Sequence, residues 1–192
     1  MKRCFDIAIS IVLGVVLLPL YTFIALTIVL FNGRPVMFFQ DRPGIHGDLF
    51  CLYKFRTMTG GKTPDGDRLT ELGRLLRRLS LDELPQLWNV LMGDMSIVGP
   101  RPLLEQYLPL YSDRQSRRHE IRPGITGWAQ INGRNISSWE DRLEMDVWYV
   151  EHHTFALDLR IILQTVFKVI SGDGVNAKGK VAVGPFKGST QE

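Results

Sequence analysis

Cysteine is scarce in this sequence, since only Cys4 and Cys51 occur among 192 residues. Two thiols exclude a disulfide-rich scaffold, and they cannot by themselves form a four-cysteine zinc site. A strong charge of one sign is also lacking, because 23 basic and 20 acidic residues leave a net charge of +3. Without a dense stripe of lysine and arginine, the sequence does not predict a nucleic-acid partner. The small positive excess is better matched to a membrane surface or a phosphorylated small molecule.

Signatures of several common enzyme classes are missing as well. The glycine-rich stretches contain no G-x-x-x-x-G-K-[ST] pattern, and no G-x-G-x-x-G follows a predicted strand. A P-loop nucleotidase and a dinucleotide-binding fold are therefore not predicted. The absence of a G-x-S-x-G segment leaves a serine hydrolase unsupported. What is present, with 45% hydrophobic and 22% charged residues, is the composition of one folded domain with its own core.

A long uncharged run, Ile7–Phe31, opens the chain. It exceeds the length of about 18 residues that is typical of a membrane segment. Pro19 lies near its middle and removes one backbone donor, so a break in the helix is expected there. The two arms, Ile7–Leu18 and Leu20–Phe31, would each be about 18 Å long. Each arm alone is shorter than the hydrocarbon core of about 30 Å.

The residues that flank this run are basic on both sides. Lys2 and Arg3 precede it, and Arg34 and Arg42 follow it. Because basic flanks prefer the cytoplasmic side, two of them favour a re-entrant helix that enters and leaves through one leaflet. A single kinked helix that spans the bilayer is the alternative. A cleaved signal peptide is disfavoured, because the run is too long and no small-residue cleavage site ends it.

The remainder of the chain has no second run of membrane length and predicts a domain lying on the membrane surface. The expected fold class is α+β, with a Pro-broken re-entrant helix in residues 1–33 and a mostly helical domain with a short β-hairpin in residues 34–175. Residues 176–192 are expected to form a flexible tail. The predicted strands and helices are Pro35–Gln40, Leu49–Met58, Asp67–Leu79, Leu81–Met92, Trp139–Glu151 and Ala156–Ile170.

Two charged features of this domain suit a phosphorylated ligand. Lys54 and Arg56 share one face of the second predicted strand, where they either clamp a phosphate or face solvent. The segment from Ser80 to Glu83 fits the capping-box pattern S-x-x-E at a helix start. Capping explains Ser80 and Glu83 but gives no reason for Asp82, whose carboxylate suits a cation or a nucleophilic role.

Arginine also recurs in loops rich in proline and glycine. Pro100 and Pro102 flank Arg101, restrict its backbone and aim its side chain from a fixed base. Two later loops, Arg122–Trp128 and Asn132–Asn135, combine arginine with glycines that let backbone N–H groups approach an anion. For the segment around Arg101, an ordinary proline-rich turn with an exposed arginine is the alternative interpretation.

Five motifs occur in order along the chain: Lys54–Met58, Leu81–Leu87, Gly99–Pro102, Arg122–Gly127 and Asn132–Arg134. Each alone is weakly specific, but together they resemble the bacterial sugar transferase family, the monotopic phosphoglycosyl transferases. The resemblance extends roughly from residue 2 to residue 170. The size is similar to that of small members, such as those that transfer N,N'-diacetylbacillosamine 1-phosphate. One departure lies in the membrane segment, where the family usually has Ser-Pro and this sequence has Leu-Pro.

The resemblance implies transfer of a sugar 1-phosphate from a UDP-sugar to undecaprenyl phosphate, with release of UMP. It implies that Asp82 attacks the phosphate attached to the sugar and forms a covalent phosphosugar intermediate. Asp82 and Glu83 are then also the expected ligands of Mg²⁺, which neutralises the diphosphate. The residues expected to bind substrate are Lys54, Arg56, Arg77, Arg101, Pro102, Arg122, Gly124, Asn132 and Arg134.

The resemblance also implies a cellular setting, the cytoplasmic face of the bacterial inner membrane. The reaction would be the first membrane step of glycoprotein or polysaccharide assembly, with downstream glycosyltransferases as further partners. An acetamido sugar such as diacetylbacillosamine is the expected donor sugar, although the motifs do not separate it from a plain hexose. Two other functions stay open: a non-enzymatic module that binds anionic lipid or a partner, and a nucleotide-sugar pyrophosphatase.

Overall fold

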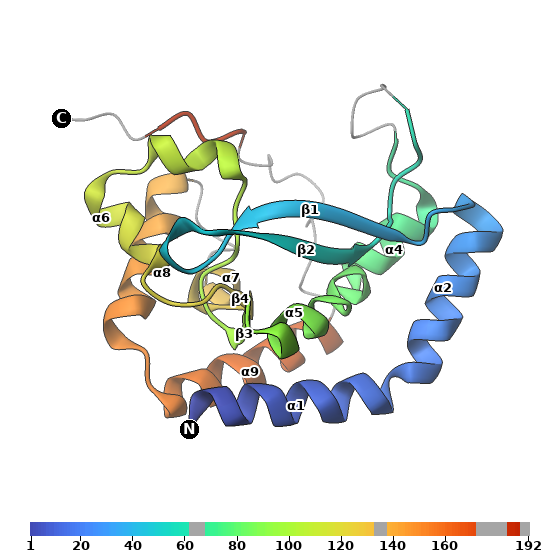
Figure 1. The fold of residues 1–192 in the computed structure, drawn as a ribbon, viewed down its shortest axis with the longest axis horizontal. Coiled ribbons are helices and arrows are strands. Elements are labelled where there is room, and N and C mark those ends of the chain that lie inside the picture. The colour runs from blue at the N-terminus through green and yellow to red at the C-terminus, as the bar shows by residue number, and fades with distance from the viewer. Residues whose placement is uncertain (62–67, 133–137, 172–183, 189–192) are drawn as a thin grey trace.

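The computed structural model describes residues 1–61, 68–132, 138–171 and 184–188. Within these ranges, helices surround two sheets of two strands each, as Figure 1 shows. The α+β class predicted from the sequence is confirmed in this respect.

The uncharged run forms two helices, α1 (Lys2–Val16) and α2 (Leu18–Asn32), bent by 61° relative to each other. The break falls at Leu17, so Pro19 lies in the first turn of α2 rather than at the kink itself. The reason is local, since proline is tolerated in a first helical turn, where its missing N–H has no intrahelical partner.

Neither of the two helices, nor any other helix in the described residues, is long and apolar enough to cross a bilayer alone. By length and composition the bent pair α1 and α2 passes the same test when taken together. The start of α1 is attached to the domain by polar contacts. Asp6 accepts hydrogen bonds from Ser96 Oγ at 2.8 Å and from the Ile97 N–H at 3.2 Å. Lys2 forms an ion pair with Asp158 at 2.6 Å.

The predicted hairpin is present as β1 (Met37–Pro43) and β2 (Leu49–Phe55), which pair antiparallel over their full length. The short helix α5 (Gln86–Met92) lies against β2. Asn89 of α5, which is fully buried, accepts from the Tyr53 N–H and donates to the Cys51 carbonyl. The hairpin is therefore fixed to the helix that follows the Asp82–Glu83 turn.

The second sheet, β3 (Ser96–Val98) with β4 (Gly124–Thr126), is parallel and was not predicted from the sequence. The helix α9 (Phe155–Ile170) contacts both of its strands, and α7 (Trp128–Asn132) packs against α9 and against α8 (Trp139–His152). Strand and helices bury a common core, and α8 and α9 match their predicted ranges within one residue at each end. The buried members of this core are Leu52, Leu87, Val90, Met95, Ile97, Val98, Ile131, Tyr149 and Ile161.

Residues 184–188, part of the expected flexible tail, are packed against the domain. Phe186 is buried among Tyr107, Tyr111 and Trp139, and the Trp139 indole donates to the Gly184 carbonyl at 2.7 Å. The other tail residues from 176 onward lie outside the described residues. The remaining short elements are η1 (Ile45–Gly47), α4 (Glu71–Arg78), η2 (Leu81–Glu83), η3 (Glu105–Leu110), α6 (Asp113–Ser116) and η4 (Arg117–His119).

Candidate active site

The Asp82–Glu83 pair lies on a short 3₁₀ turn, η2, and not inside a longer helix. The helix predicted over Leu81–Met92 begins only after Pro85. The predicted capping box is wrong, because Ser80 has a left-handed backbone (φ 55°) and its side chain caps nothing. An N-cap residue needs an extended backbone to reach the turn that follows it.

Glu83 is held by two cations rather than by a helix cap. Its Oε1 accepts from Lys54 Nζ at 2.7 Å and from Arg101 Nη2 at 2.5 Å, and its Oε2 lies 3.3 Å from Arg101 Nη1. Burial alone would raise the pKa of Glu83, but Arg101 and Lys54 outweigh it and hold that pKa at about 2. Glu83 therefore stays ionised at neutral pH, and its charge holds Lys54 and Arg101 beside Asp82.

Asp82 has the opposite environment, although it is the adjacent residue. Its side chain is buried, and within the described parts of the chain no donor contacts its carboxylate. Burial raises the pKa of Asp82, and the charge of Glu83 raises it further, while Lys54, Arg77 and Arg101 act in the opposite direction. A carboxylate surrounded by cations but bonded to none of them is available to a ligand.

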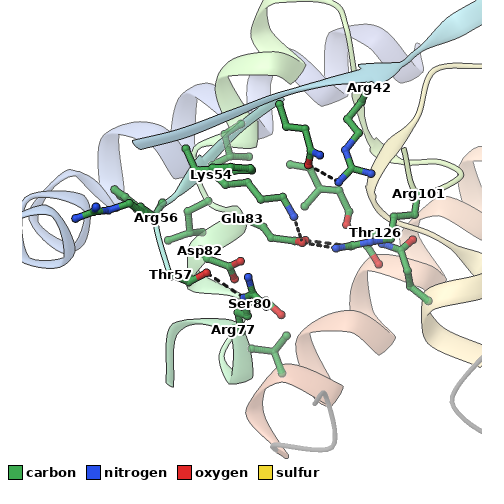
Figure 2. A pocket seen from close by; sticks show the side chains of 18 of the residues that line it. Arg42, Lys54, Arg56, Thr57, Arg77, Ser80, Asp82, Glu83, Arg101 and Thr126 are labelled. Atoms are coloured by element: carbon green, nitrogen blue, oxygen red, sulfur yellow. Dashed lines mark hydrogen bonds and ion pairs between the residues drawn. The ribbon is translucent and has the colours of Figure 1, made fainter. Parts of the chain in front are cut away.

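Figure 2 shows how Lys54, Arg77 and Arg101 surround this pair from three different elements. Lys54 comes from β2, Arg77 from the last turn of α4, and Arg101 from the loop after β3. Arg77 donates from Nε to the buried Thr57 hydroxyl at 3.0 Å. The structure thus brings together three cations that lie far apart in the sequence, of which Lys54 and Arg101 belong to two of the five motifs and Arg77 to none.

The pair lines a cavity of about 1140 Å³. Its lining combines cationic side chains, among them Lys54, Arg77 and Arg101, with aliphatic side chains from α1, α5, β3 and α9. A cavity lined by both cationic and aliphatic side chains suits an amphiphilic ligand. The aliphatic wall residues include Leu13, Leu84, Leu87, Ile97, Ile162 and Val166.

Arg42 and Gln40 of β1 belong to this cavity and were missed as site residues. Arg42 donates to Gln40 at 2.6 Å and approaches the Pro102 carbonyl at 3.4 Å. The signal that would have found them is the period of two along β1, because alternate residues of paired strands share the face that carries Lys54.

Several other predicted substrate-binding residues have structural contacts instead. Arg56 lines the same cavity as Lys54, but its guanidinium points away from Glu83 in Figure 2 and donates to the carbonyls of Asn32 and Gly33. Arg122 is exposed and donates to the Gly93 carbonyl at 2.7 Å. Arg56 therefore shares the cavity of the Asp82–Glu83 pair, whereas Arg122 is not among the described residues that line it.

The rest of the predicted set divides between buried backbone and exposed loop. Pro102 is buried next to Arg101. Gly124 lies where its backbone meets that of Gly99 so closely that a Cβ would come within 2.0 Å of the Gly99 nitrogen. Asn132 is exposed and donates within its own helix, and Arg134 lies outside the described residues. Position 124 therefore requires glycine because two backbone segments of the chain, at Gly99 and Gly124, pack closely there.

Comparison with known proteins was made for the whole sequence. The family model described as bacterial sugar transferase matches residues 1–172. The uncharacterized sugar transferase EpsL of Bacillus subtilis is 53% identical over 98% of this chain and 96% of its own length. The undecaprenyl-phosphate glucose phosphotransferase of Komagataeibacter xylinus is 41% identical over 88% of this chain. The undecaprenyl-phosphate galactose phosphotransferase of Salmonella typhimurium is 36% identical over 91% of this chain.

The extent of these matches differs between relatives. The chain spans nearly all of EpsL but only 36% of the Komagataeibacter protein and 41% of the Salmonella protein. In this chain, the region matched by the family model includes both the bent helix pair and the Asp82–Glu83 turn. The chain belongs to the bacterial sugar transferase family.

Proposed function

We propose that this protein transfers a sugar 1-phosphate from a UDP-sugar to undecaprenyl phosphate and releases UMP. The observation that carries the proposal is the unbonded Asp82 carboxylate beside Glu83, in a cavity lined by both cationic and aliphatic side chains. The names of several relatives support it, because they are undecaprenyl-phosphate phosphotransferases for glucose, galactose or N-acetylgalactosamine. The cavity offers cationic side chains that suit the phosphates of both substrates and aliphatic side chains that suit the lipid.

In the first step, a carboxylate oxygen of Asp82 attacks the phosphorus atom that carries the sugar. A bond forms between that oxygen and phosphorus, the diphosphate bond breaks, and UMP leaves with the bonding electron pair. In the second step, a phosphate oxygen of undecaprenyl phosphate attacks the same phosphorus atom. The Asp82 carboxylate is released, and the product is the sugar joined to the lipid through a diphosphate.

Both steps bring an anion toward a phosphate, so they require positive charge near the reacting atoms. Lys54 and Arg101 are held in place by Glu83, and Arg77 is held by Thr57. Because these cations are fixed before substrate arrives, little reorganisation is needed as charge develops. Glu83 therefore acts by holding cations, and Asp82 acts on the substrate.

Mg²⁺ fits this arrangement through Asp82 rather than through both carboxylates. Glu83 Oε1 is bonded to two cations, whereas no described donor contacts the Asp82 carboxylate. Mg²⁺ often takes one or two carboxylates and completes its shell with substrate phosphates and water. When bound, it would supply further neutralisation of the diphosphate charge.

The same proposal includes attachment to the cytoplasmic face of the bacterial inner membrane through the bent pair α1 and α2. The pair passes a length and composition test only when taken together, and both of its flanks are basic. A re-entrant helix would bring the cavity to the depth of lipid phosphates. An acetamido sugar is our first choice of donor, with undecaprenyl diphosphate sugar passed on to downstream glycosyltransferases.

The test is UMP release by purified protein with Mg²⁺, undecaprenyl phosphate and UDP-sugars that carry glucose, galactose, N-acetylgalactosamine or diacetylbacillosamine. We expect UMP from one donor, dependent on the lipid, and a loss of at least about 1,000-fold in Asp82→Asn. Asp113→Asn, at an exposed position in α6, is the matched control and should keep full activity. With radiolabelled sugar and no lipid, the wild type should retain one label per chain on Asp82.

Three outcomes would contradict the proposal. Repeated UMP release without lipid would indicate a pyrophosphatase that uses water as the acceptor. Full activity of Asp82→Asn would exclude the covalent role of Asp82. Folded protein that binds lipid but releases no UMP from any donor would favour a non-enzymatic binding module.

A further inference from the structure

The turn that carries the two carboxylates is packed on one side against the bent helix pair. Leu81 and Leu84 stand three residues apart, and in a 3₁₀ turn residues at this spacing project from the same side. Both leucines pack against the cluster formed by Ile24 and Ile28 of α2 with Phe55. The Asp82 and Glu83 side chains, between the leucines, line the cavity, as Leu84 also does.

One polar contact joins α2 directly to this turn. The Tyr21 hydroxyl donates to the Leu84 carbonyl at 2.6 Å, although the two residues are far apart in the chain. The Tyr21 ring is held by Phe55, whose centroid lies 5.7 Å away. Leu84 directly follows Glu83, so the Tyr21 hydroxyl binds the backbone immediately after the Asp82–Glu83 pair.

The backbone of the turn has few strong bonds of its own. The Glu83 N–H reaches the Ser80 carbonyl at 3.3 Å, and the Leu84 N–H reaches the Leu81 carbonyl at 3.4 Å. Both distances exceed the usual 2.9–3.0 Å for this type of bond. The shorter contact from Tyr21 is therefore a substantial part of what fixes the orientation of the turn.

We infer that Tyr21 is a positioning residue for the reaction: its hydroxyl, on a helix of the proposed membrane segment, holds the Asp82–Glu83 turn in its working orientation. This inference rests on the proposed function. It assigns the bent pair a second task beside attachment, because the seating of α2 would then govern where the Asp82 carboxylate points. Misplacement of a catalytic group by about 1 Å can cost about 100-fold in rate.

The test compares Tyr21→Phe with wild type in the same lipid vesicles. Phenylalanine keeps the ring that contacts Phe55 and removes only the donor. We expect kcat for UMP release to fall about tenfold while KM for the UDP-sugar changes less than about twofold, since the cations that bind substrate stay in place. Amide exchange at Leu87, whose N–H bonds to the same Leu84 carbonyl at 3.0 Å, should become faster.

The matched control is Thr22→Val on the same helix. Thr22 is exposed, and its hydroxyl bonds only within α2, to the Leu18 carbonyl at 3.0 Å. Thr22→Val should leave kcat, vesicle binding and amide exchange at Leu87 unchanged. Two further replacements of Tyr21 match each other in size: 4-aminophenylalanine keeps a donor and should restore kcat, whereas 4-methylphenylalanine has none and should not.

Equal kcat for Tyr21→Phe and wild type would overturn the inference and leave the proposed function intact. Equal activity of the 4-amino and 4-methyl variants would do the same, even if Tyr21→Phe proved unstable. An increase in KM alone would indicate a role in binding and would also overturn it. If the wild type released no UMP at all, the proposed function would fail. Amide exchange would still test the contact, because unchanged exchange at Leu87 in Tyr21→Phe would show that the Tyr21 hydroxyl does not hold the turn.

Discussion

At the scale of single residues, Asp82 and Glu83 are adjacent carboxylates with opposite roles. Burial raises the pKa of Asp82, whereas Arg101 and Lys54 hold that of Glu83 at about 2 despite its burial. Environments that separate the pKa values of neighbouring acids are typical of sites in which one acid reacts and the other provides fixed charge. The sequence placed both acids in one motif, and the resemblance implied roles for them, but neither gave these two environments, because the cations that bind Glu83 come from other elements.

This difference predicts the pH dependence of the reaction. In the proposed reaction the deprotonated form of Asp82 is the nucleophile, so activity should be lost as pH falls through the pKa of Asp82. Because that pKa is raised, the loss should occur at a higher pH than for a free aspartate, while Glu83 stays ionised. The measurement is kcat/KM for the UDP-sugar between about pH 4 and pH 8.

A variant at Arg77 checks whether the loss of activity at low pH, the acid limb of the pH profile, is due to Asp82. Arg77 lowers the pKa of Asp82 but forms no ion pair with Glu83 within the described residues, so it perturbs one acid selectively. Arg77→Gln should therefore move the acid limb to higher pH as well as reduce the rate. A limb that stays in place, or that shifts to lower pH, would mean that another group titrates.

At the scale of elements, local patterns predicted most of the fold. The β1–β2 hairpin, α8 and α9 follow from alternation, turn residues and helical spacing, and the structure contains all three. The pattern at Ser80 gave the wrong interpretation, because contacts from distant residues override local capping: Glu83 binds Lys54 and Arg101 instead. Strands as short as β3 and β4 have no periodicity to detect, and their pairing is purely tertiary.

The contact between α4 and the segment after β2 makes Gly73 a sensitive position. A Cβ at Gly73 would lie 2.0 Å from the Thr57 carbonyl oxygen, so the helix must move if any side chain is added. We expect Gly73→Ala to lower the free energy of unfolding by about 1–3 kcal/mol, as overpacking does elsewhere. It should also reduce activity, because Arg77 would lose its bond to the Thr57 hydroxyl.

Chemical denaturation and UMP release measure these two effects. Gly184→Ala is the control, because a Cβ there meets nothing within 4 Å and the residue is not among those that line the cavity. It should change neither the unfolding free energy nor the rate. Full stability of Gly73→Ala would show that α4 can shift without cost, and full activity would show that Arg77 does not need its present position.

At the scale of the whole molecule, apolar surface gathers on a few helices. Figure 1 shows α1 and α9 along one edge of the structure, with α2 rising from the end of α1. The two edge helices meet at their N-terminal ends, where Phe5 contacts Phe155 at 5.1 Å between ring centroids. The cavity reaches α1 and α9 through Leu13 and Val166. The large exposed apolar residues on these helices include Val12, Val15, Val16, Phe23, Leu26, Leu163, Phe167 and Ile170.

If this surface contacts lipid, as proposed, a charge placed on it should weaken attachment without unfolding the domain. Leu163 of α9 is 71% exposed, so Leu163→Glu removes little from the core. Withdrawing a leucine side chain from an apolar phase costs about 1.5–3 kcal/mol, so binding to anionic vesicles should weaken at least about tenfold. Gln106→Glu adds the same charge at an exposed residue of η3 and should bind as wild type does. Equal vesicle binding by both variants, with both folded, would exclude α9 from the lipid surface and leave attachment to the bent pair alone.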